Sequence, residues 1–535
     1  MAFRPEIVQA LGARDDSVNA ILPECALPEP LPSNVQGLPA QILSADEIAI
    51  TERDPVVLVG KLRSKEWSCE TVVQAFLRRA ALAQKTTNCI TELLWKEAIA
   101  RARHLDSLPQ PAGPLHGLPI SIKEQFGVPG KINNNGFVAC CGRIRGPPCS
   151  LHDVVEGCGA VIFARTTQPQ SVMHLETNSN IYGRTANPWN RNLSAGGSSG
   201  GEGALVGFRG SPLGLGGDIG GSIRSPAANN GVYGFKLHGC IGPLSPTLSG
   251  IELFMKAYLD TMPWVRENYL VPIPWRDVEL PKTLKIGIMW SDGIVNPHPP
   301  IHRALSQIAK ALKSADFEVV DWQPKEHDEC WKLTSALYYE DGGDRLRHML
   351  KMGDEQVLPL TEWLLGQEEV KARSVEEVWG VSIAQNACMP TAATDDDTCQ
   401  LKAKRNAYRS MYNQHWLDTG KDDGHPVDAI LCPVGPGCAP PHDQARYWNY
   451  TSQWNLLEYP AISFPVTQVD TRLVVPNDDY VPMNELDRFN HDLYTTAERY
   501  LDAPVSLQLV TRRYEDEKCI AVLREIEAAL KRGTC

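Results

Sequence analysis

The spacing of apolar and polar residues predicts helices near both ends of the chain. Ser44 and Glu47 fit a capping box, and Asp54 followed by Pro55 fits an N-cap with proline at the first helical position. An apolar stripe at positions i, i+3, i+4 and i+7 then predicts one buried helix face: Val73, Phe76, Leu77 and Ala80. Acidic residues begin and basic residues end the segment 515–532, as the helix dipole favours.

Short apolar runs that are typical of strands alternate with helical segments between these ends. They cover residues 118–123, 160–164, 284–290, 318–322, 429–432, 461–466 and 506–510. The long segments between the runs suit crossover connections. The pattern therefore predicts an α/β fold with a mixed or mostly parallel sheet covered by helices.

Composition and charge narrow the classes of protein that fit this pattern. The chain has 535 residues, of which 43% are hydrophobic, so it can bury a large core. The net charge is -12 and no basic stripe occurs, which disfavours nucleic-acid binding. No window approaches the roughly 18 consecutive apolar residues of a membrane-spanning helix, so none is expected.

The number and spacing of the cysteines indicate whether the protein works in a reducing or an oxidising compartment. The 15 cysteines form no C-x-x-C pair, and an odd number cannot all pair within one chain, so a reducing compartment is the simpler interpretation. The first residues are interrupted by charge and lack the apolar region of a signal peptide. We therefore expect a cytoplasmic protein.

The domain organisation is expected to be simple, with an N-terminal extension over residues 1–43 and a single domain over 44–535. Within that domain, residues 325–425 are richer in charge and Trp and lack clear alternation. This region is predicted to be a variable lobe beside the sheet. Together with the residues up to about 460, it is expected to supply walls of a substrate pocket.

A lysine at a predicted strand end is the first candidate for chemistry. Leu118, Ile120 and Ile122 alternate with Pro119, Ser121 and Lys123, so the lysine lies on the face opposite the apolar residues. Taken alone, such a lysine is usually a solvated charge. Two serine-containing glycine clusters later in the chain make a chemical role worth testing.

The first cluster, residues 196–200, matches the G-x-S-x-G pattern of a nucleophile elbow. That elbow needs an apolar strand directly before it, and the preceding residues "NPWNRNLSA" do not form one. The elbow is therefore disfavoured, although His425 or His442 could formally serve as its base.

The second cluster, residues 218–224, places two glycines directly before Ser222. Glycines let consecutive backbone N–H groups point one way, as an oxyanion hole beside a nucleophile requires. The alternative is a tight turn in which Ser222 serves only as a helix N-cap. The cluster alone leaves both interpretations open.

A serine nucleophile needs a base, and neither cluster contains a histidine. His174 and His238 flank the region, but lone histidines are more often structural. A lysine acts as a base only when neutral, which requires its pKa to fall from about 10.4 toward about 7 to 8. No S-x-x-K motif occurs at any lysine, so a lysine base must come from elsewhere in the fold.

Three strings carry a family resemblance: "GLPISIKEQF", "GGSSGGEGAL" and "GGDIGGSIRSPAANNGVYGFK". They resemble the amidase signature family, including fungal acetamidases and fatty acid amide hydrolases. Weaker likeness runs from about residue 44 through 450–466 to 502–518. The resemblance implies one α/β/α domain with a large mixed sheet covered by helices on both sides.

The same resemblance implies roles for individual residues. Ser222 matches the nucleophile, Ser198 the bridging serine that follows a cis peptide bond from Gly197, and Lys123 the neutral base. The oxyanion donors are implied to be the backbone N–H groups of Ile219, Gly220, Gly221 and Ser222. Ser199, Asp218 and Arg224 match supporting polar positions, and the main chain at Val172 matches a border of the substrate site.

The implied activity is hydrolysis of a linear carboxamide to a carboxylate and ammonia or an amine through an acyl-enzyme. No metal or organic cofactor is expected, and homodimers are common in the family. The alternatives are a glutaminase subunit of a tRNA-dependent amidotransferase and a non-catalytic amide-binding relative. Glu124 replaces an Asp of many relatives, and "KINNNGF" at 131–137 departs from the family pattern. The acyl chain of the substrate stays open.

Overall fold

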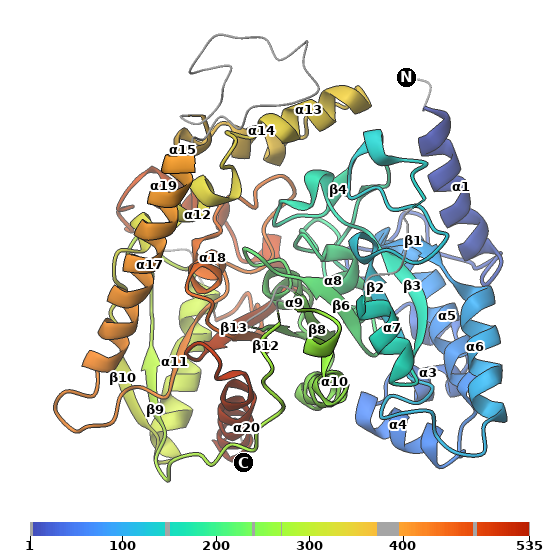
Figure 1. Cartoon of the computed structure of the whole chain (residues 1–535), viewed down its shortest axis with the longest axis horizontal. Coiled ribbons are helices and arrows are strands. Elements are labelled where there is room, and N and C mark those ends of the chain that lie inside the picture. The colour runs from blue at the N-terminus through green and yellow to red at the C-terminus, as the bar shows by residue number, and fades with distance from the viewer. Residues whose placement is uncertain are drawn as a thin grey trace.

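A large mixed sheet forms the centre of the computed structural model, which describes residues 4–144, 150–237, 241–268, 270–371, 395–473 and 479–533 (Figure 1). In these ranges eleven strands pair in the order β1-β3-β2-β6-β8-β7-β12-β13-β11-β9-β10. Their bounds are β1 Ile90–Leu93, β2 Pro119–Lys123, β3 Val161–Thr166, β6 Gly214–Gly217, β7 Tyr233–Lys236, β8 Ile241–Ser245, β9 Lys285–Ile288, β10 Glu318–Asp321, β11 Ala429–Pro433, β12 Ala461–Gln468 and β13 Pro504–Val510. A separate small ribbon pairs β4 (Asn178–Ser179) with β5 (Gly183–Arg184).

The pairing is antiparallel in the middle of the sheet and parallel on either side of it, and the edge strand β1 pairs antiparallel with β3. β2 pairs in parallel with β3 and β6, and β9 pairs in parallel with β10 and β11. The pairs from β6 through β8, β7, β12 and β13 to β11 are antiparallel. All seven predicted strand runs are strands, whereas β1, β6, β7 and β8 were not predicted because they are short and three of them contain glycine.

Helices cover both faces of this sheet. They are α1 Pro5–Asn19, α2 Pro39–Ile42, α3 Ala45–Thr51, α4 Pro55–Arg63, α5 Cys69–Thr87, α6 Trp95–Ser107, α7 Ser150–Gly157, α8 Gly200–Gly207, α9 Arg224–Asn230, α10 Leu248–Asp260, α11 Pro299–Ser314, α12 His327–Tyr338, α13 Asp344–Gly353, α14 Pro359–Leu365, α15 Glu368–Lys371, α17 Asp395–Asp418, α18 Asn449–Leu456, α19 Glu485–Leu493 and α20 Asp516–Gly533. The predicted capping box at Ser44 and the Asp54 N-cap are both present, so these start signals are confirmed.

The alternation along β13 shows how the two faces differ. Leu507 and its apolar neighbours belong to the main core, and α11 and α20 contact this strand. Ser506 and Gln508 point the other way, because the Ser506 hydroxyl donates to the Ala228 carbonyl of α9 and Gln508 accepts from Arg224. One face of the sheet is therefore apolar, the other carries polar groups toward α8 and α9, and the α/β/α expectation is confirmed.

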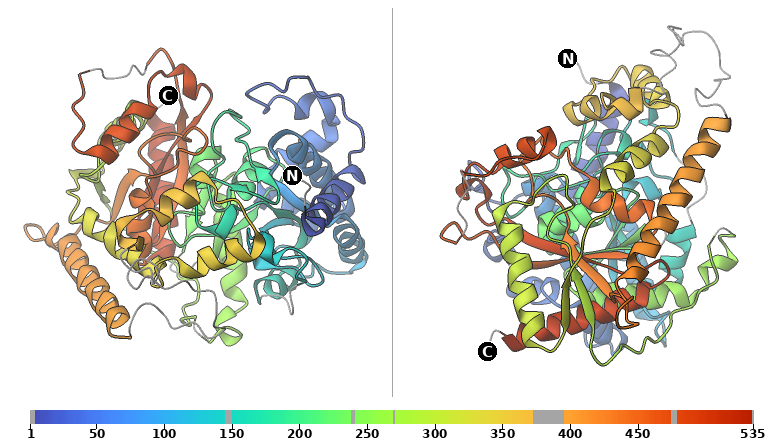
Figure 2. Two further views of the ribbon diagram at one scale, coloured as in Figure 1. Left: turned by 90° about the horizontal axis from the view of Figure 1, so that it is seen from above. Right: turned by 90° about the vertical axis from the view of Figure 1, so that its left-hand side faces the viewer.

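The described part of the predicted lobe is helical. Helices α12 to α15 and α17 come from it, and residues 372–394 lie outside the described ranges. Figures 1 and 2 show α13 and α14 on the upper side of the molecule in the view of Figure 1, above α8 and α9. Leu346 and Leu360 from this lobe share a hydrophobic cluster with Trp448, next to α18. The domain boundaries themselves stay a prediction.

The N-terminal segment also packs on the sheet. Helix α1 contacts β1 and α5, and the Leu93 backbone N–H donates to the Ser17 hydroxyl at 3.0 Å. The first 43 residues therefore include a helix that covers the β1 edge.

We predict that Leu507→Ala lowers the free energy of unfolding by about 2 to 5 kcal/mol, because Leu507 is fully buried and the change leaves a cavity. The midpoint of urea unfolding of the full chain measures the effect. Leu501, which is 50% exposed, is the matched control, and its change to Ala should alter stability by less than about 0.5 kcal/mol. Equal midpoints for the two variants would contradict the packing described for β13.

Candidate active site

A buried lysine and a serine form the centre of the site. The hydrogen bond between Lys123 Nζ and Ser198 Oγ is 2.6 Å long, and both side chains are buried. Lys123 is the last residue of β2, and the peptide bond between Gly197 and Ser198 is cis. Gly197 has no room for a side chain, because a Cβ there would lie 2.3 Å from the His174 carbonyl oxygen. The strand end and the first glycine cluster thus meet as expected.

Burial changes the acid–base behaviour of Lys123. Loss of contact with water lowers the pKa of its amine to about 7, although the carboxyl groups of Asp218 and Glu202 oppose this shift. An amine with this pKa is substantially neutral near pH 7 and can accept a proton. The structure therefore provides the condition that a lysine base requires.

Glu202 of α8 lies beside this pair, and the sequence alone did not single it out. Its carboxyl group accepts hydrogen bonds from Ser121 Oγ at 2.5 Å and Thr166 Oγ1 at 2.7 Å. Ser121 shares a face of β2 with Lys123, and Thr166 is paired with Lys123 in the register of β2 and β3. Burial raises the pKa of Glu202. The sequence signal that could have identified Glu202 is that it is an acidic residue in the otherwise apolar helix "GGEGALVG".

Ser222 lies in the turn before α9, beside the lysine–serine pair. Its carbonyl oxygen accepts from the Ser199 backbone N–H at 3.1 Å, which joins the two glycine clusters. Of the three predicted catalytic residues, Ser222 is the most exposed, at 8% against 2% for Ser198 and 0% for Lys123. No hydrogen bond joins the Ser198 and Ser222 hydroxyls within the described contacts, so that step of the relay stays a prediction.

The backbone around Ser222 offers unpaired donors. The N–H groups of Ile219, Gly220 and Ser222 have no acceptor among the described hydrogen bonds. The fourth predicted donor differs, because the Gly221 N–H donates to Asp218 Oδ1 at 2.8 Å. Gly221 has a φ of +129°, and a Cβ there would lie 2.2 Å from Thr451 Oγ1, so this position requires glycine.

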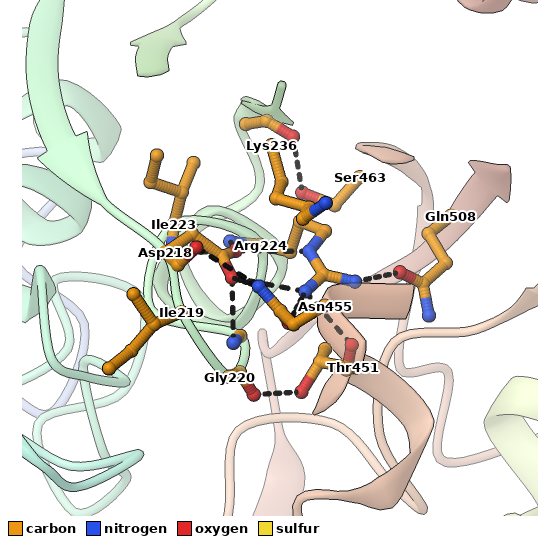
Figure 3. A network of polar contacts seen from close by, with 12 residues as sticks. Asp218, Ile219, Gly220, Ile223, Arg224, Lys236, Thr451, Asn455, Ser463 and Gln508 are labelled. Atoms are coloured by element: carbon orange, nitrogen blue, oxygen red, sulfur yellow. Dashed lines mark hydrogen bonds and ion pairs between the residues drawn. The ribbon is translucent and has the colours of Figure 1, made fainter. Parts of the chain in front are cut away.

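A buried ion pair fixes the second glycine cluster (Figure 3). Arg224 Nε donates to Asp218 Oδ2 and Arg224 Nη2 donates to Asp218 Oδ1, both at 3.0 Å. Burial alone would raise the pKa of Asp218, but the Arg224 guanidinium and the Asn455 amide hold it well below its usual range. The carboxylate also accepts the backbone N–H groups of Ile223 and Arg224, so it organises the whole turn.

Residues distant in the sequence complete this network, and the sequence alone did not identify them. Arg224 donates to the Thr451 carbonyl, to Asn455 Oδ1 and to Gln508 Oε1 at 3.0, 2.6 and 3.0 Å. Thr451 Oγ1 donates to the Gly220 carbonyl at 2.7 Å. The sequence did contain a signal that could have identified Thr451, Asn455 and Gln508, because they lie in segments 450–466 and 502–518, which weakly resemble the amidase signature family.

Two further predicted positions have distinctive local structure. The Ser199 hydroxyl accepts from the Gly217 backbone N–H at 3.3 Å and so holds the end of β6. Val172 has a φ of +62° and follows Ser171 at +61°. Positive φ is a genuine outlier for a β-branched residue, and such strain is concentrated at functional sites. The segment around Val172 is thus a candidate border of the site.

The histidines considered as alternative bases have other partners. His174 is fully buried and bonded to a threonine hydroxyl at 2.7 Å, and burial lowers its pKa to about 3. His425 and His442 each contact a carboxylate. None of these three bonds either predicted catalytic serine, and His238 lies outside the described residues.

Other features of the described ranges bear on the earlier expectations. No helix within them is long and apolar enough to cross a membrane. They contain no group of three or more His, Cys, Asp or Glu side chains placed to hold a metal ion. Every cysteine in this part of the chain is a free thiol.

Comparison with known families identifies the class of protein. A model of the Amidase family matches residues 71–520, so the chain belongs to the amidase family and is an enzyme that hydrolyses amides. This match confirms the resemblance drawn from the three glycine-containing strings.

Individual relatives cover nearly the whole chain. C550.07 of Schizosaccharomyces pombe is 42% identical over 97% of both chains, and the acetamidase of Emericella nidulans is 35% identical over 92% of this chain and 94% of its own. The solved structure of a fatty acid amide hydrolase covers 98% of this chain and 95% of its own, with a TM-score of 0.88 at 31% identity. None of these names supports the glutaminase-subunit alternative.

We predict that Asp218→Asn destabilises the protein by about 3 to 5 kcal/mol, because it leaves the buried Arg224 without its carboxylate. The midpoint of urea unfolding measures the loss. Asp153→Asn, at a carboxylate whose side chain is 52% exposed, serves as the control and should shift stability by less than about 0.5 kcal/mol. An unchanged midpoint for Asp218→Asn would show that the ion pair does not hold the turn.

Proposed function

We propose that this amidase hydrolyses linear carboxamides to a carboxylate and ammonia or an amine, with Ser222 as nucleophile, Ser198 as bridge and Lys123 as base. The observation that supports this proposal is the 2.6 Å hydrogen bond between the buried Lys123 amine and Ser198, beside the turn that carries Ser222. The lowered pKa of Lys123 makes its amine a proton acceptor near neutral pH.

In the proposed reaction, Ser198 relays a proton between Ser222 and Lys123. As the Ser222 oxygen attacks the amide carbonyl, its proton passes to Ser198 while Ser198 gives its own proton to Lys123. The unpaired N–H groups of Ile219, Gly220 and Ser222 stabilise the negative charge that develops on the carbonyl oxygen. The proton then returns through Ser198 to the leaving nitrogen, and water hydrolyses the acyl-enzyme.

The names of the relatives support a range of acyl chains. One relative is an acetamidase and one structural neighbour is a fatty acid amide hydrolase. The names of similar proteins therefore include amides of both short and long acyl groups. A homodimer and a cytoplasmic location stay predictions, which sedimentation of the purified protein and fractionation of cells would test. Turnover across a panel of amides separates the proposal from the non-catalytic alternative.

We predict that a fluorophosphonate probe labels the protein covalently and that Ser222→Ala removes the labelling, because the probe reacts with an activated serine oxygen. In-gel fluorescence and intact mass measure the adduct. Ser314→Ala, at an exposed serine on α11, should label like the unmodified protein. Full labelling of Ser222→Ala would remove Ser222 from the role of nucleophile.

The rate should depend on pH through Lys123. Because only the neutral amine accepts a proton, kcat/KM should fall tenfold per pH unit below the pKa of about 7 and level off above it. Lys123→Ala should lose about 10²- to 10⁴-fold in kcat/KM at pH 8. Lys310→Ala, at an exposed lysine on α11, should keep the profile. A flat profile from pH 8 to pH 5 would contradict a lysine base.

A further inference from the structure

The two peptide bonds on either side of Gly220 are held in different ways. Figure 3 shows Thr451 beside the Gly220 carbonyl, to which its Oγ1 donates at 2.7 Å. The N–H of the same peptide bond belongs to Gly221 and donates to Asp218 Oδ1 at 2.8 Å, so this bond is fixed at both ends. In the preceding peptide bond, from Ile219 to Gly220, the N–H has no acceptor among the described hydrogen bonds. This N–H is therefore available to a bound substrate.

The side chain of Tyr338 holds that preceding peptide bond at its carbonyl end. The Tyr338 hydroxyl donates to the Ile219 carbonyl, and its oxygen lies 2.9 Å from the point where a Cβ of Gly220 would be. The peptide bond between Ile219 and Gly220 is trans. In a trans peptide plane the C=O and N–H groups point in opposite directions, so a bond that fixes the carbonyl also fixes the direction of the N–H.

Helix α12, which ends at Tyr338, is joined to the helix that supplies Thr451. The two helices, α12 and α18, contact each other. At their first residues, Asn449 Nδ2 of α18 donates to the His327 carbonyl of α12 at 2.7 Å. The hydroxyls that hold the Ile219 and Gly220 carbonyls therefore come from two helices that are bonded to each other.

We propose that Tyr338 is a positioning residue for the oxyanion hole, in which its hydroxyl aims the Gly220 N–H at the carbonyl oxygen of the bound amide. It acts through the peptide bond between Ile219 and Gly220 rather than on the substrate. The lobe at residues 325–425, which was expected to supply pocket walls, thereby also shapes the reacting centre. The proposal rests on the mechanism proposed above and adds to it a residue outside the glycine clusters.

Tyr338→Phe should lower kcat by about tenfold to a hundredfold for the linear amide that the unmodified enzyme hydrolyses fastest. The loss is smaller than that for a removed oxyanion donor, because the Gly220 N–H remains but is no longer held. KM should change by less than about twofold, since this N–H acts on charge that develops only in the transition state. The pH profile of kcat/KM should keep its midpoint, because Lys123 is unaltered.

Tyr339→Phe is the matched control. Tyr339 is the next residue along the chain, and its buried ring belongs to the hydrophobic cluster against which Tyr338 packs. Its hydroxyl has no hydrogen-bond partner within the described residues. Removal of this hydroxyl should leave kcat and KM unchanged. The midpoints of urea unfolding of both variants and of the unmodified protein show that all three are folded.

The trifluoromethyl ketone with the same alkyl chain as that amide provides a second measurement. The Ser222 oxygen adds to the ketone carbon, the serine proton passes through Ser198 to Lys123, and the former carbonyl oxygen becomes an oxyanion. The adduct therefore resembles the transition state. The inhibition constant of the ketone should rise in Tyr338→Phe by the same factor as kcat falls.

Three results would overturn the proposal. They are a Tyr338→Phe enzyme with unchanged kcat and ketone affinity, an equal loss in Tyr339→Phe, and a change confined to KM. Turnover by Ser222→Ala separates this proposal from the proposed function. An inactive Ser222→Ala beside a fully active Tyr338→Phe would reject the role of Tyr338 alone. An active Ser222→Ala beside an impaired Tyr338→Phe would reject Ser222 as nucleophile and keep Tyr338 as the residue that holds the turn.

Discussion

The removal of Lys123 from water is the constraint on which the rest of the site depends. A lysine in solvent is protonated at neutral pH and cannot accept a proton from serine. Placing the amine at the buried end of β2, under the glycine clusters, lowers its pKa to about 7 and leaves Ser198 as its hydrogen-bond partner. This burial needs a large sheet with helices on both faces, which a small domain would not provide.

The glycine clusters are shaped by the same need for close approach. Ser198 reaches Lys123 because Gly197 packs directly against the His174 carbonyl. Gly214 likewise leaves space for the Glu202 carboxyl group, one oxygen of which lies 2.0 Å from the point where a Cβ of Gly214 would be. The turn at Gly221 is held by the Asp218 carboxylate, which Arg224 neutralises. Backbone packing and buried charge therefore act together to position the serines.

Much of the fold was predictable from the sequence, because its longer strands are apolar runs and its first helices carry capping residues such as Ser44. Strands β6 and β7 were not predicted, because their glycines have no side chains and so leave no alternation of apolar and polar residues. Lys123, Ser198 and Ser222 were singled out through motifs. Gln508 was not, because no local pattern tells which distant strand will lie under Arg224. The use of the Gly221 N–H by Asp218 likewise depends on three-dimensional geometry.

The order of the strands has a consequence for how the enzyme is made. β13 is the last strand in the described chain, yet it lies between β12 and β11 and supplies Gln508 to Arg224. During synthesis on the ribosome, the segment with both serines emerges nearly three hundred residues before this partner. Until β13 leaves the exit tunnel, the guanidinium lacks one of its acceptors and the middle of the sheet has an open edge. The network around Arg224 is therefore complete only after the residues of β13, up to Val510, have left the ribosome.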